Sequence, residues 1–263
     1  MKIINSTENS EIKYLKRLQE SGGFRKEERK FLIEGPPSIK SLLERGIRPL
    51  QVYISSEMMG DADYFHKSCE QFSIPVTELS AKCYMKISVV ETPQGLAALF
   101  AFPEPDAENI LQNKEGLFLC CHGIQDPGNM GAMIRTADAA GASAVIAIPP
   151  SVSFYNPKTV RASAGSILSL PCIELEEAEF ITVIKKRRIN LYAAVPREGA
   201  PFHLARFQRP LCILIGSEAH GLPEWIQSRA KLVTIPMRNA VESLNAAVSA
   251  AILLYQASRE NGK

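Results

Sequence analysis

The chain has 263 residues, of which 46% are hydrophobic, so it can form one large domain or two small ones around buried cores. No apolar run reaches the roughly 18 residues of a membrane-spanning helix, and the N-terminus lacks the charged start and apolar stretch of a secretory signal. The net charge of +2 gives no overall field for a polyanion, so any nucleic-acid surface has to be a local basic patch.

Residues 1–30 contain such a patch. Helical spacing of Ile12, Leu15 and Leu18 predicts a helix that begins near Glu11. The basic residues on and after this helix include Lys13, Lys16, Arg17, Arg25 and Arg29. A mixed charge run of this kind is either a solvated face or a set of phosphate contacts, which carry no sequence information. The residues alone leave both interpretations open.

Short strands then alternate with helices up to residue 102. The predicted strands are 31–34, 50–54, 75–78 and 95–102, and the predicted helices are 38–45, 63–72 and 81–87. This alternation predicts a small α/β sandwich without catalytic residues. The polar segment that follows contains two prolines and reads as a linker. We therefore expect an N-terminal domain over 1–104, a linker over 105–115 and a C-terminal domain over 116–263.

The C-terminal domain opens with a strand–helix–strand unit over 117–122, 129–140 and 144–148, which predicts a parallel sheet. Asn129 is placed to cap the helix. Arg135 is either an exposed helical arginine or a guanidinium fork for a phosphate.

Two later stretches carry polar residues at strand ends. The apolar strand Leu211–Ile215 runs into Gly216 and Glu218, and a glycine directly after a strand lets a ligand approach the backbone. The next strand ends before Pro236, and helical spacing resumes after Ser243, a plausible N-cap. Ligands of open α/β sheets lie outside the carboxyl ends of the strands.

Three stretches together resemble a known family. They are Asn129-Met-Gly-Ala-Met-Ile-Arg135, Leu214-Ile-Gly-Ser-Glu-Ala-His-Gly221, and Ile235-Pro-Met with Ser243-Leu-Asn245. Their order and spacing resemble the three motifs of the SpoU (TrmH-like) ribose 2'-O-methyltransferases of the SPOUT class. The resemblance covers about the last 150 residues closely and the first 100 more loosely, where the chain is similar to ribosomal-protein-like substrate-binding domains.

The resemblance implies S-adenosyl-L-methionine as methyl donor, an RNA ribose 2'-hydroxyl as acceptor, a deep C-terminal trefoil knot and a homodimer through the C-terminal domain. The implied catalytic residues are Asn129, Arg135, Glu218, Ser243 and Asn245, and the implied cofactor-binding residues are Leu214, Ile215, Gly216, Ile235, Met237 and Leu244. It also favours phosphate contact for the basic patch and adds Arg161 to it. The N-terminal domain favours ribosomal over transfer RNA.

The chemistry of this residue set is consistent with that implication. The chain has no dinucleotide or P-loop glycine pattern, no nucleophile elbow and no clustered metal ligands, and we expect reduced, buried cysteines in a cytoplasmic protein without metal. A set of amides, a carboxylate and a guanidinium orients groups for an already activated donor. Because arginine stays protonated, Arg135 is an anchor for charge. The alternatives are a tRNA 2'-O-methyltransferase, a base-modifying SPOUT enzyme and a non-catalytic RNA-binding protein.

Overall fold

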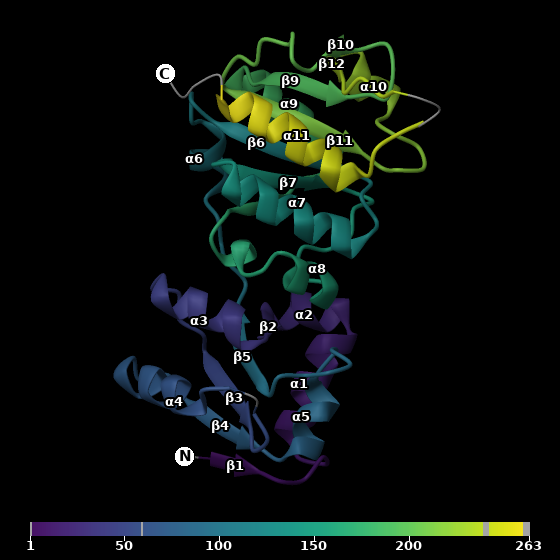
Figure 1. Cartoon of the computed structure of the whole chain (residues 1–263). Coiled ribbons are helices and arrows are strands. Elements are labelled where there is room, and N and C mark those ends of the chain that lie inside the picture. Colours follow the sequence, from purple (N-terminus) through teal and green to yellow (C-terminus); the bar gives the residue numbers. More distant parts are fainter. Residues whose placement is uncertain (1, 59, 239–241, 260–263) are drawn as a thin grey trace. The chain divides into compact units, whose positions relative to one another are not determined.

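The computed structural model describes residues 2–58, 60–238 and 242–259. It divides into two compact units, each of which has its own sheet (Figure 1). The N-terminal unit comprises Met1–Pro103 and Tyr155–Gly165, and the C-terminal unit comprises Glu104–Phe154 and Ser166–Lys263.

The described strands of the N-terminal unit form a sheet in the order β1-β4-β3-β5-β2. Their bounds are β1 Lys2–Ile4, β2 Lys30–Glu34, β3 Gln51–Ser55, β4 Val76–Leu79 and β5 Leu96–Ala101. β5 runs antiparallel to both of its neighbours, and the other pairs are parallel. The sequence pattern missed β1, which is three residues long, too short for an alternation to show.

Helices cover both faces of this sheet. Their bounds are α1 Ser10–Glu20, α2 Gly22–Glu28, α3 Pro36–Glu44, α4 Ala62–Gln71, α5 Ala81–Ile87 and α8 Pro157–Ala162. Figure 1 shows α1 and α5 side by side on one face and α3 and α4 on the other. The predicted apolar stripe of α1 is buried against the sheet, with Ile12, Leu15 and Leu18 at most 1% exposed. The α/β sandwich is therefore confirmed.

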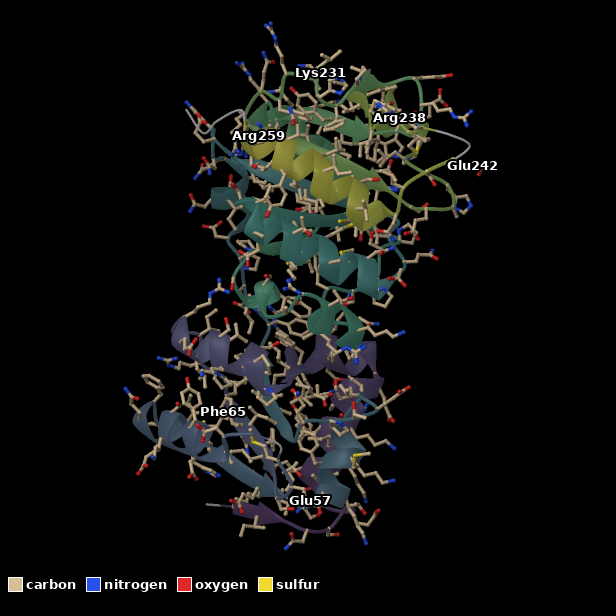
Figure 2. The ribbon with its side chains drawn as sticks, viewed as in Figure 1. Glu57, Phe65, Lys231, Arg238, Glu242 and Arg259 are labelled. Atoms are coloured by element: carbon tan, nitrogen blue, oxygen red, sulfur yellow. The ribbon has the colours of Figure 1, made fainter. Side chains whose placement is uncertain are left out.

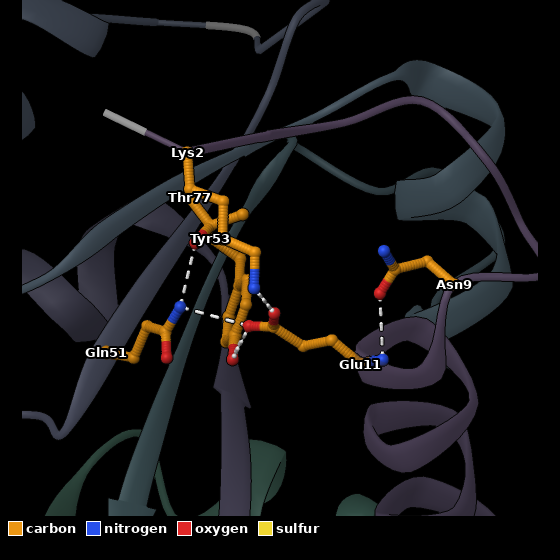
Figure 3. Close-up of polar contacts among 6 residues, drawn as sticks. All are labelled: Lys2, Asn9, Glu11, Gln51, Tyr53 and Thr77. Atoms are coloured by element: carbon orange, nitrogen blue, oxygen red, sulfur yellow. Dashed lines mark hydrogen bonds and ion pairs between the residues drawn. The ribbon is translucent and has the colours of Figure 1, made fainter.

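A partly buried polar network fixes α1 to this sheet (Figure 3). The Glu11 carboxylate accepts hydrogen bonds from Tyr53 Oη at 3.0 Å and Gln51 Nε2 at 3.1 Å, and it pairs with Lys2. Gln51 Nε2 also donates to Thr77 Oγ1 at 2.8 Å. Burial and the Glu11 charge raise the pKa of Tyr53 above its ordinary value. The network joins β1, α1, β3 and β4, so its role is structural.

The segment 155–165 comes from the second half of the chain but packs in the N-terminal unit. The Tyr155 ring stacks on Phe102, with centroids 3.6 Å apart, and lies 5.0 Å from the Phe31 ring. α8 contacts β2. The segment was expected in the C-terminal domain because sequence spacing does not reveal which sheet covers an aromatic ring. The borders at 104 and 116 stay a prediction.

The described strands of the C-terminal unit form a seven-stranded sheet in the order β10-β12-β9-β11-β6-β7-β8, and all its pairs are parallel. Their bounds are β6 Leu117–His122, β7 Ala144–Ile148, β8 Cys172–Glu174, β9 Asn190–Ala194, β10 Ala200–Pro201, β11 Leu211–Gly216 and β12 Lys231–Thr234. This confirms the parallel α/β sheet. The trefoil knot stays a prediction.

Helices and one 3-10 turn connect these strands. Their bounds are α6 Ala107–Leu111, α7 Pro127–Ala139, η1 Ser166–Leu168, α9 Glu177–Arg187, α10 Glu224–Gln227 and α11 Ala246–Arg259. α11 packs against α7 and β11. Figure 2 labels Arg238 and Glu242, which flank residues 239–241 ahead of α11, and Arg259 at its other end. None of the helices in the described ranges combines the length and hydropathy that crossing a bilayer requires.

Two helix starts differ from the sequence prediction. α7 begins at Pro127, and Asp126 caps it by accepting the backbone N–H of Asn129 at 2.7 Å. α11 begins at Ala246, and the side chain of Asn245 accepts the N–H groups of Ala247 and Val248. Asn129 and Ser243 are therefore not the caps. In both cases another capping residue stood close by in sequence, and spacing alone did not distinguish the two.

Candidate active site

The site lies where the order of the C-terminal sheet reverses. β6 is followed outward by β7 and β8 on one side, while β11, β9 and β12 lie on its other side. β6 and β11 are direct neighbours, with Gly216 opposite His122 at their carboxyl ends. In open α/β sheets, ligands bind at such a switch point, outside the carboxyl ends of the strands.

A cavity of about 530 Å³, the first cavity, lies beside the ends of β9, β11 and β12. Its walls come from segments 194–198, 215–222, 233–237 and 243–249 and from Gln227, and they include Ile215, Gly216, Ile235, Met237 and Leu244. This volume lies within the roughly 300–1,000 Å³ of small-molecule sites. The cavity therefore has the size and the place of a ligand site.

Five of the six predicted cofactor residues line the first cavity, and Leu214 does not. Leu214 is fully buried because it points into the core on the opposite side of the strand. The sequence prediction missed the wall made by Ala194–Glu198, which directly follows β9. The rule that ligands lie at strand ends applied to β9 as well, but no motif drew attention to it.

Gly216 is required by the turn that shapes this wall. A Cβ at Gly216 would lie within 2.5 Å of the backbone nitrogen of Leu222, so no larger residue fits. The loop after β11 folds back, and the N–H of Gly221 donates to the Ser217 carbonyl at 2.8 Å. Gly216 therefore allows close approach of the chain's own backbone, in addition to the approach of a ligand that the sequence predicted.

Three predicted polar residues meet at the rim of the first cavity. Asn129 Nδ2 donates to Glu218 Oε1, and Asn245 Nδ2 donates to Asn129 Oδ1 at 2.9 Å and to the same Glu218 oxygen at 3.5 Å. These residues come from α7, from the loop after β11 and from the start of α11. We call Asn129, Glu218 and Asn245 the amide–carboxylate cluster. Two of its members, Glu218 and Asn245, are exposed, so the cluster is accessible.

The remaining predicted catalytic residues lie apart from the cluster. Ser243 is exposed and lines the first cavity. Arg135 is exposed on α7, six residues and so about 9 Å along the helix from Asn129, and it is not among the residues that line the cavity. The structure therefore brings three of the five predicted residues into contact, places Ser243 in the wall of the first cavity and leaves Arg135 on the surface.

Comparison with known proteins gives a consistent result. The model of the SpoU rRNA Methylase family matches residues 116–255, and that of the MRM3-like substrate binding domain matches residues 9–98. The chain belongs to the SpoU rRNA methylase family. It is therefore an RNA methyltransferase.

Individual SpoU relatives match along nearly the whole chain. The 23S rRNA (guanosine(2553)-2'-O)-methyltransferase RlmP of Bacillus subtilis is 30% identical over 97% of this chain and 98% of its own. A solved RNA 2'-O ribose methyltransferase is 35% identical, with a TM-score of 0.83 and 98% of each chain covered. The AdoMet-bound rRNA methyltransferase of Sinorhizobium meliloti has a TM-score of 0.88 at 25% identity and covers 100% of this chain and 99% of its own.

The predicted RNA-binding residues of this SpoU chain lie in the N-terminal unit. Lys13 pairs with Glu8 at 2.8 Å, Lys16 pairs with Glu20 at 3.5 Å, and Arg17 lies over the Phe24 ring. Lys13 and Arg17 are exposed, as are Arg29 and, on α8, Arg161. Surface ion pairs such as those of Lys13 and Lys16 are weak, so they do not prevent these two side chains from contacting phosphates.

Arg25 differs from this prediction. It is only 6% exposed, and its Nη1 donates to the backbone carbonyls of Leu18 at 2.6 Å and Gln19 at 3.0 Å. Its guanidinium therefore holds the end of α1 and does not face solvent. The sequence could not separate Arg25 from its neighbours, because α2 follows α1 after a single residue and turns this position inward.

The described part of the chain contains no group of three or more histidine, cysteine, aspartate or glutamate side chains arranged to hold a metal ion. The six cysteines are free thiols, and Cys172 is the one that is not buried. Burial raises the pKa of the Cys69 thiol to about 11, so that it stays protonated.

Proposed function

We propose that this protein transfers a methyl group from S-adenosyl-L-methionine to a ribose 2'-hydroxyl of ribosomal RNA. The observation that carries the proposal is the amide–carboxylate cluster at the rim of the first cavity. Two relatives support the substrate: RlmP, and a Streptomyces viridochromogenes protein named as a 23S rRNA (uridine(2479)-2'-O)-methyltransferase, which is 33% identical over 65% of this chain. We further propose that this reaction takes place in the cytoplasm.

The residues of the first cavity fit the proposed cofactor. Ile215, Ile235 and Leu244 give apolar surface for an adenosyl group, and the charged side chains of the walls are the carboxylates Glu198 and Glu218 and the guanidinium of Arg197. A sulfonium is cationic, and carboxylates at the wall favour a cation over an anion. The solved relative from Sinorhizobium meliloti is AdoMet-bound. When bound, the cofactor supplies an activated methyl group.

The amide–carboxylate cluster would hold the acceptor. Glu218 is the only carboxylate among its three members, and both amides donate to its Oε1. The carboxylate is thereby fixed in orientation while its second oxygen can accept a ribose hydroxyl. Holding reactants in attack geometry can supply roughly 7–11 kcal/mol of a barrier. The cluster therefore positions and polarises the 2'-hydroxyl, and it does not attack.

Arg135 would act across a homodimer. It stays on the surface of its own protomer, on α7, which packs against α11. α11 exposes Val248 (48%) and Tyr255 (50%), two apolar side chains that a second copy of the chain would cover. We propose a dimer through α7 and α11 in which Arg135 anchors the substrate phosphate at the partner's cavity.

The basic surface of the N-terminal unit would hold the RNA without reading its sequence. We propose Lys13, Lys16, Arg17, Arg29 and Arg161 for this role, and Arg25 is removed from it because it is buried.

Two measurements test the proposal. Calorimetric titration with S-adenosylmethionine should show saturable binding. If no binding is detected, the result contradicts the proposed methyl transfer and supports a non-catalytic RNA-binding protein. Total RNA from cells lacking the protein is then methylated in vitro, digested with nucleases and analysed by nucleoside mass spectrometry. We expect a new 2'-O-methylnucleoside in the ribosomal fraction. A methylated base, or a mark confined to transfer RNA, would support the corresponding alternative.

A further inference from the structure

A second cavity lies at the same end of the C-terminal sheet. It has a volume of about 380 Å³ and is lined by the end of β6 and the loop after it, by Pro150 after β7, by the loop 217–221 and by Pro223; the first of these segments contributes His122, Gly123, Gln125 and Asp126. The loop 217–221 lines the first cavity as well, so it separates two hollows at one switch point. The role proposed for the first cavity leaves the second unexplained.

The composition of its walls excludes a phosphate as the ligand. Among the described residues that line it, none is lysine or arginine, whereas Asp126 and Glu218 are both carboxylates. The polar side chains that remain are the two histidines, His122 and His220, together with Gln125 and Ser217. An anion would be repelled here, while an uncharged ring with donors and acceptors on its edge would be bound.

Several of these groups are available to such a ligand. Within the described residues, the side chains of Gln125 and His220 make no hydrogen bond, and both are exposed. His122 is half-buried, and its ring lies edge-on to that of Trp225, with the two ring centroids 6.3 Å apart. Burial lowers the pKa of His122, so that at neutral pH its imidazole offers one donor and one acceptor. Proline rings at positions 150 and 223 add flat apolar surface.

Glu218 connects the two cavities. It lines both of them, and the amides of Asn129 and Asn245 hold it in place. A nucleoside with its base in the second cavity would thus carry its sugar to Glu218, at the rim of the first. The cavity is large enough, since its volume lies within the range of about 300–1,000 Å³ for ligand sites.

We propose that the second cavity receives the base of the nucleotide to be methylated, and that His122 and Gln125 recognise the edge of that base. This inference rests on the proposed function and adds to it the residues that select the base. Enzymes that act on a nucleotide within folded RNA can turn the base out of its stack and read its edge by hydrogen bonds in a pocket. The two relatives named above are named as methyltransferases of nucleosides with different bases, a guanosine and a uridine.

Trp225 provides a test that needs no methyl transfer. It is the single tryptophan of the chain and stands beside His122. Its fluorescence is titrated with each of the four ribonucleosides in the presence of saturating S-adenosylhomocysteine, which keeps the first cavity filled. We expect a saturable change with one nucleoside that is lost in His122→Ala and Gln125→Ala. His203→Ala and Gln112→Ala, exposed residues outside both cavities, are the matched controls and should keep the response.

A second measurement asks whether the two residues select the base. Transcripts of the methylated rRNA segment are made with each of the four bases at the target position, and kcat/KM is measured for each. The preference for the native base should fall roughly 5- to 100-fold in the two variants, the range for loss of base-edge hydrogen bonds. Because Gln125 is exposed, its variant decides the outcome if His122→Ala is destabilised.

The outcomes separate this inference from the proposed function. A wild-type protein that gives the nucleoside response but methylates no RNA contradicts the proposed function alone. Three results would overturn the assignment of the second cavity. They are the lack of a saturable fluorescence response with any nucleoside, a response in both variants equal to that of the wild type, and an unchanged base preference in both variants.

Discussion

Glu11 and Glu218 are both carboxylates that collect donors from distant parts of the chain, but their surroundings differ. Glu11 uses both oxygens: Tyr53 and Gln51 donate to Oε1, and Lys2 pairs with Oε2. Glu218 is exposed, and within the described residues its side-chain donors reach only Oε1. Glu11, which is paired on both oxygens, therefore holds the fold together, whereas Glu218, which is held through one oxygen, keeps the other as an acceptor for a ligand.

The surroundings of the two clusters support this reading. Tyr53 and Thr77, which complete the Glu11 network, are each 1% exposed, and the network joins a helix to three strands (Figure 3). The amide–carboxylate cluster joins two amides and a carboxylate at the rim of a cavity. A buried network that loses a member leaves an unpaired polar group, which costs stability. An exposed cluster that loses a member is rehydrated, so the loss appears in function.

Loss of Arg135, which lies outside the amide–carboxylate cluster of its own protomer, should have the strongest effect on activity. Arg135→Ala should abolish methyl transfer while calorimetry still detects S-adenosylmethionine binding, because Arg135 is not among the residues lining the first cavity. If Arg135 acts across a dimer, mixing Arg135→Ala with Glu218→Ala should restore about one quarter of the wild-type activity, since half the dimers are mixed and each has one intact site.

The control for this experiment mixes Glu218→Ala with Asn129→Ala. These two side chains bind each other within one protomer, so every site in a mixed dimer carries a defect. The control mixture should stay inactive. Arg135→Ala turning over at the wild-type rate would remove the residue from catalysis, and a mixture without recovery would remove it from the partner's site.

The next effect is on Glu218 itself. Glu218→Ala should lower kcat by roughly 10²–10³-fold, the range for loss of one preorganised polar group in an active site. Its thermal midpoint should stay close to that of the wild type, because surface substitutions usually change stability by no more than about 0.5 kcal/mol. Steady-state methylation assays and differential scanning calorimetry measure the two quantities. A large fall in midpoint with kcat unchanged would make Glu218 a structural residue like Glu11.

The architecture was largely predictable from sequence because hydrophobic periodicity reports burial. The strand–helix–strand unit at 117–148 and the strand before Gly216 are present as predicted. The three-residue β1, the two-residue β10 and the packing of Tyr155 against Phe102 were not foreseen. Very short strands carry no period, and ring stacking between residues far apart in sequence has no local pattern.

The site was predictable to a different extent. The family resemblance predicted one site from three residues at the ends of separate elements, Asn129, Glu218 and Asn245. In the structure these three side chains are in contact. Arg25 could not be separated from its exposed neighbours, because its burial depends on how α2 turns back on α1. Leu214 was predicted to bind the cofactor because its sequence neighbours were. It is buried in the core instead, since alternate residues of a strand face opposite sides.

Breaking the Glu11 network should have a smaller effect, on the free energy of unfolding. Glu11→Ala leaves the Tyr53 hydroxyl without its acceptor, and an unpaired buried polar group costs about 1–3 kcal/mol. The free energy of unfolding from a urea titration should fall by that amount, while S-adenosylmethionine binding at low temperature stays unchanged. Lys2→Ala is the matched control, since Lys2 is an exposed partner of the same carboxylate and its removal should cost less.

The smallest effect is a pH dependence of the same network. The pKa of Tyr53 is raised by burial and by Glu11, so the folded protein holds the phenol proton above the pH at which the unfolded chain releases it. The stability from this proton is fully present below about pH 10, the ordinary tyrosine value, and is lost as pH rises further, by up to about 1.4 kcal/mol per pH unit for one group.

Tyr53→Phe should cost about 0.5–1.5 kcal/mol at pH 7 through the lost hydrogen bond. Above pH 10 the variant should lose stability less steeply than the wild type, so their two curves converge. Tyr255→Phe, at an exposed position, is the matched control and should leave the alkaline slope unchanged. Parallel curves for wild type and Tyr53→Phe would show that the Glu11 network does not hold this proton.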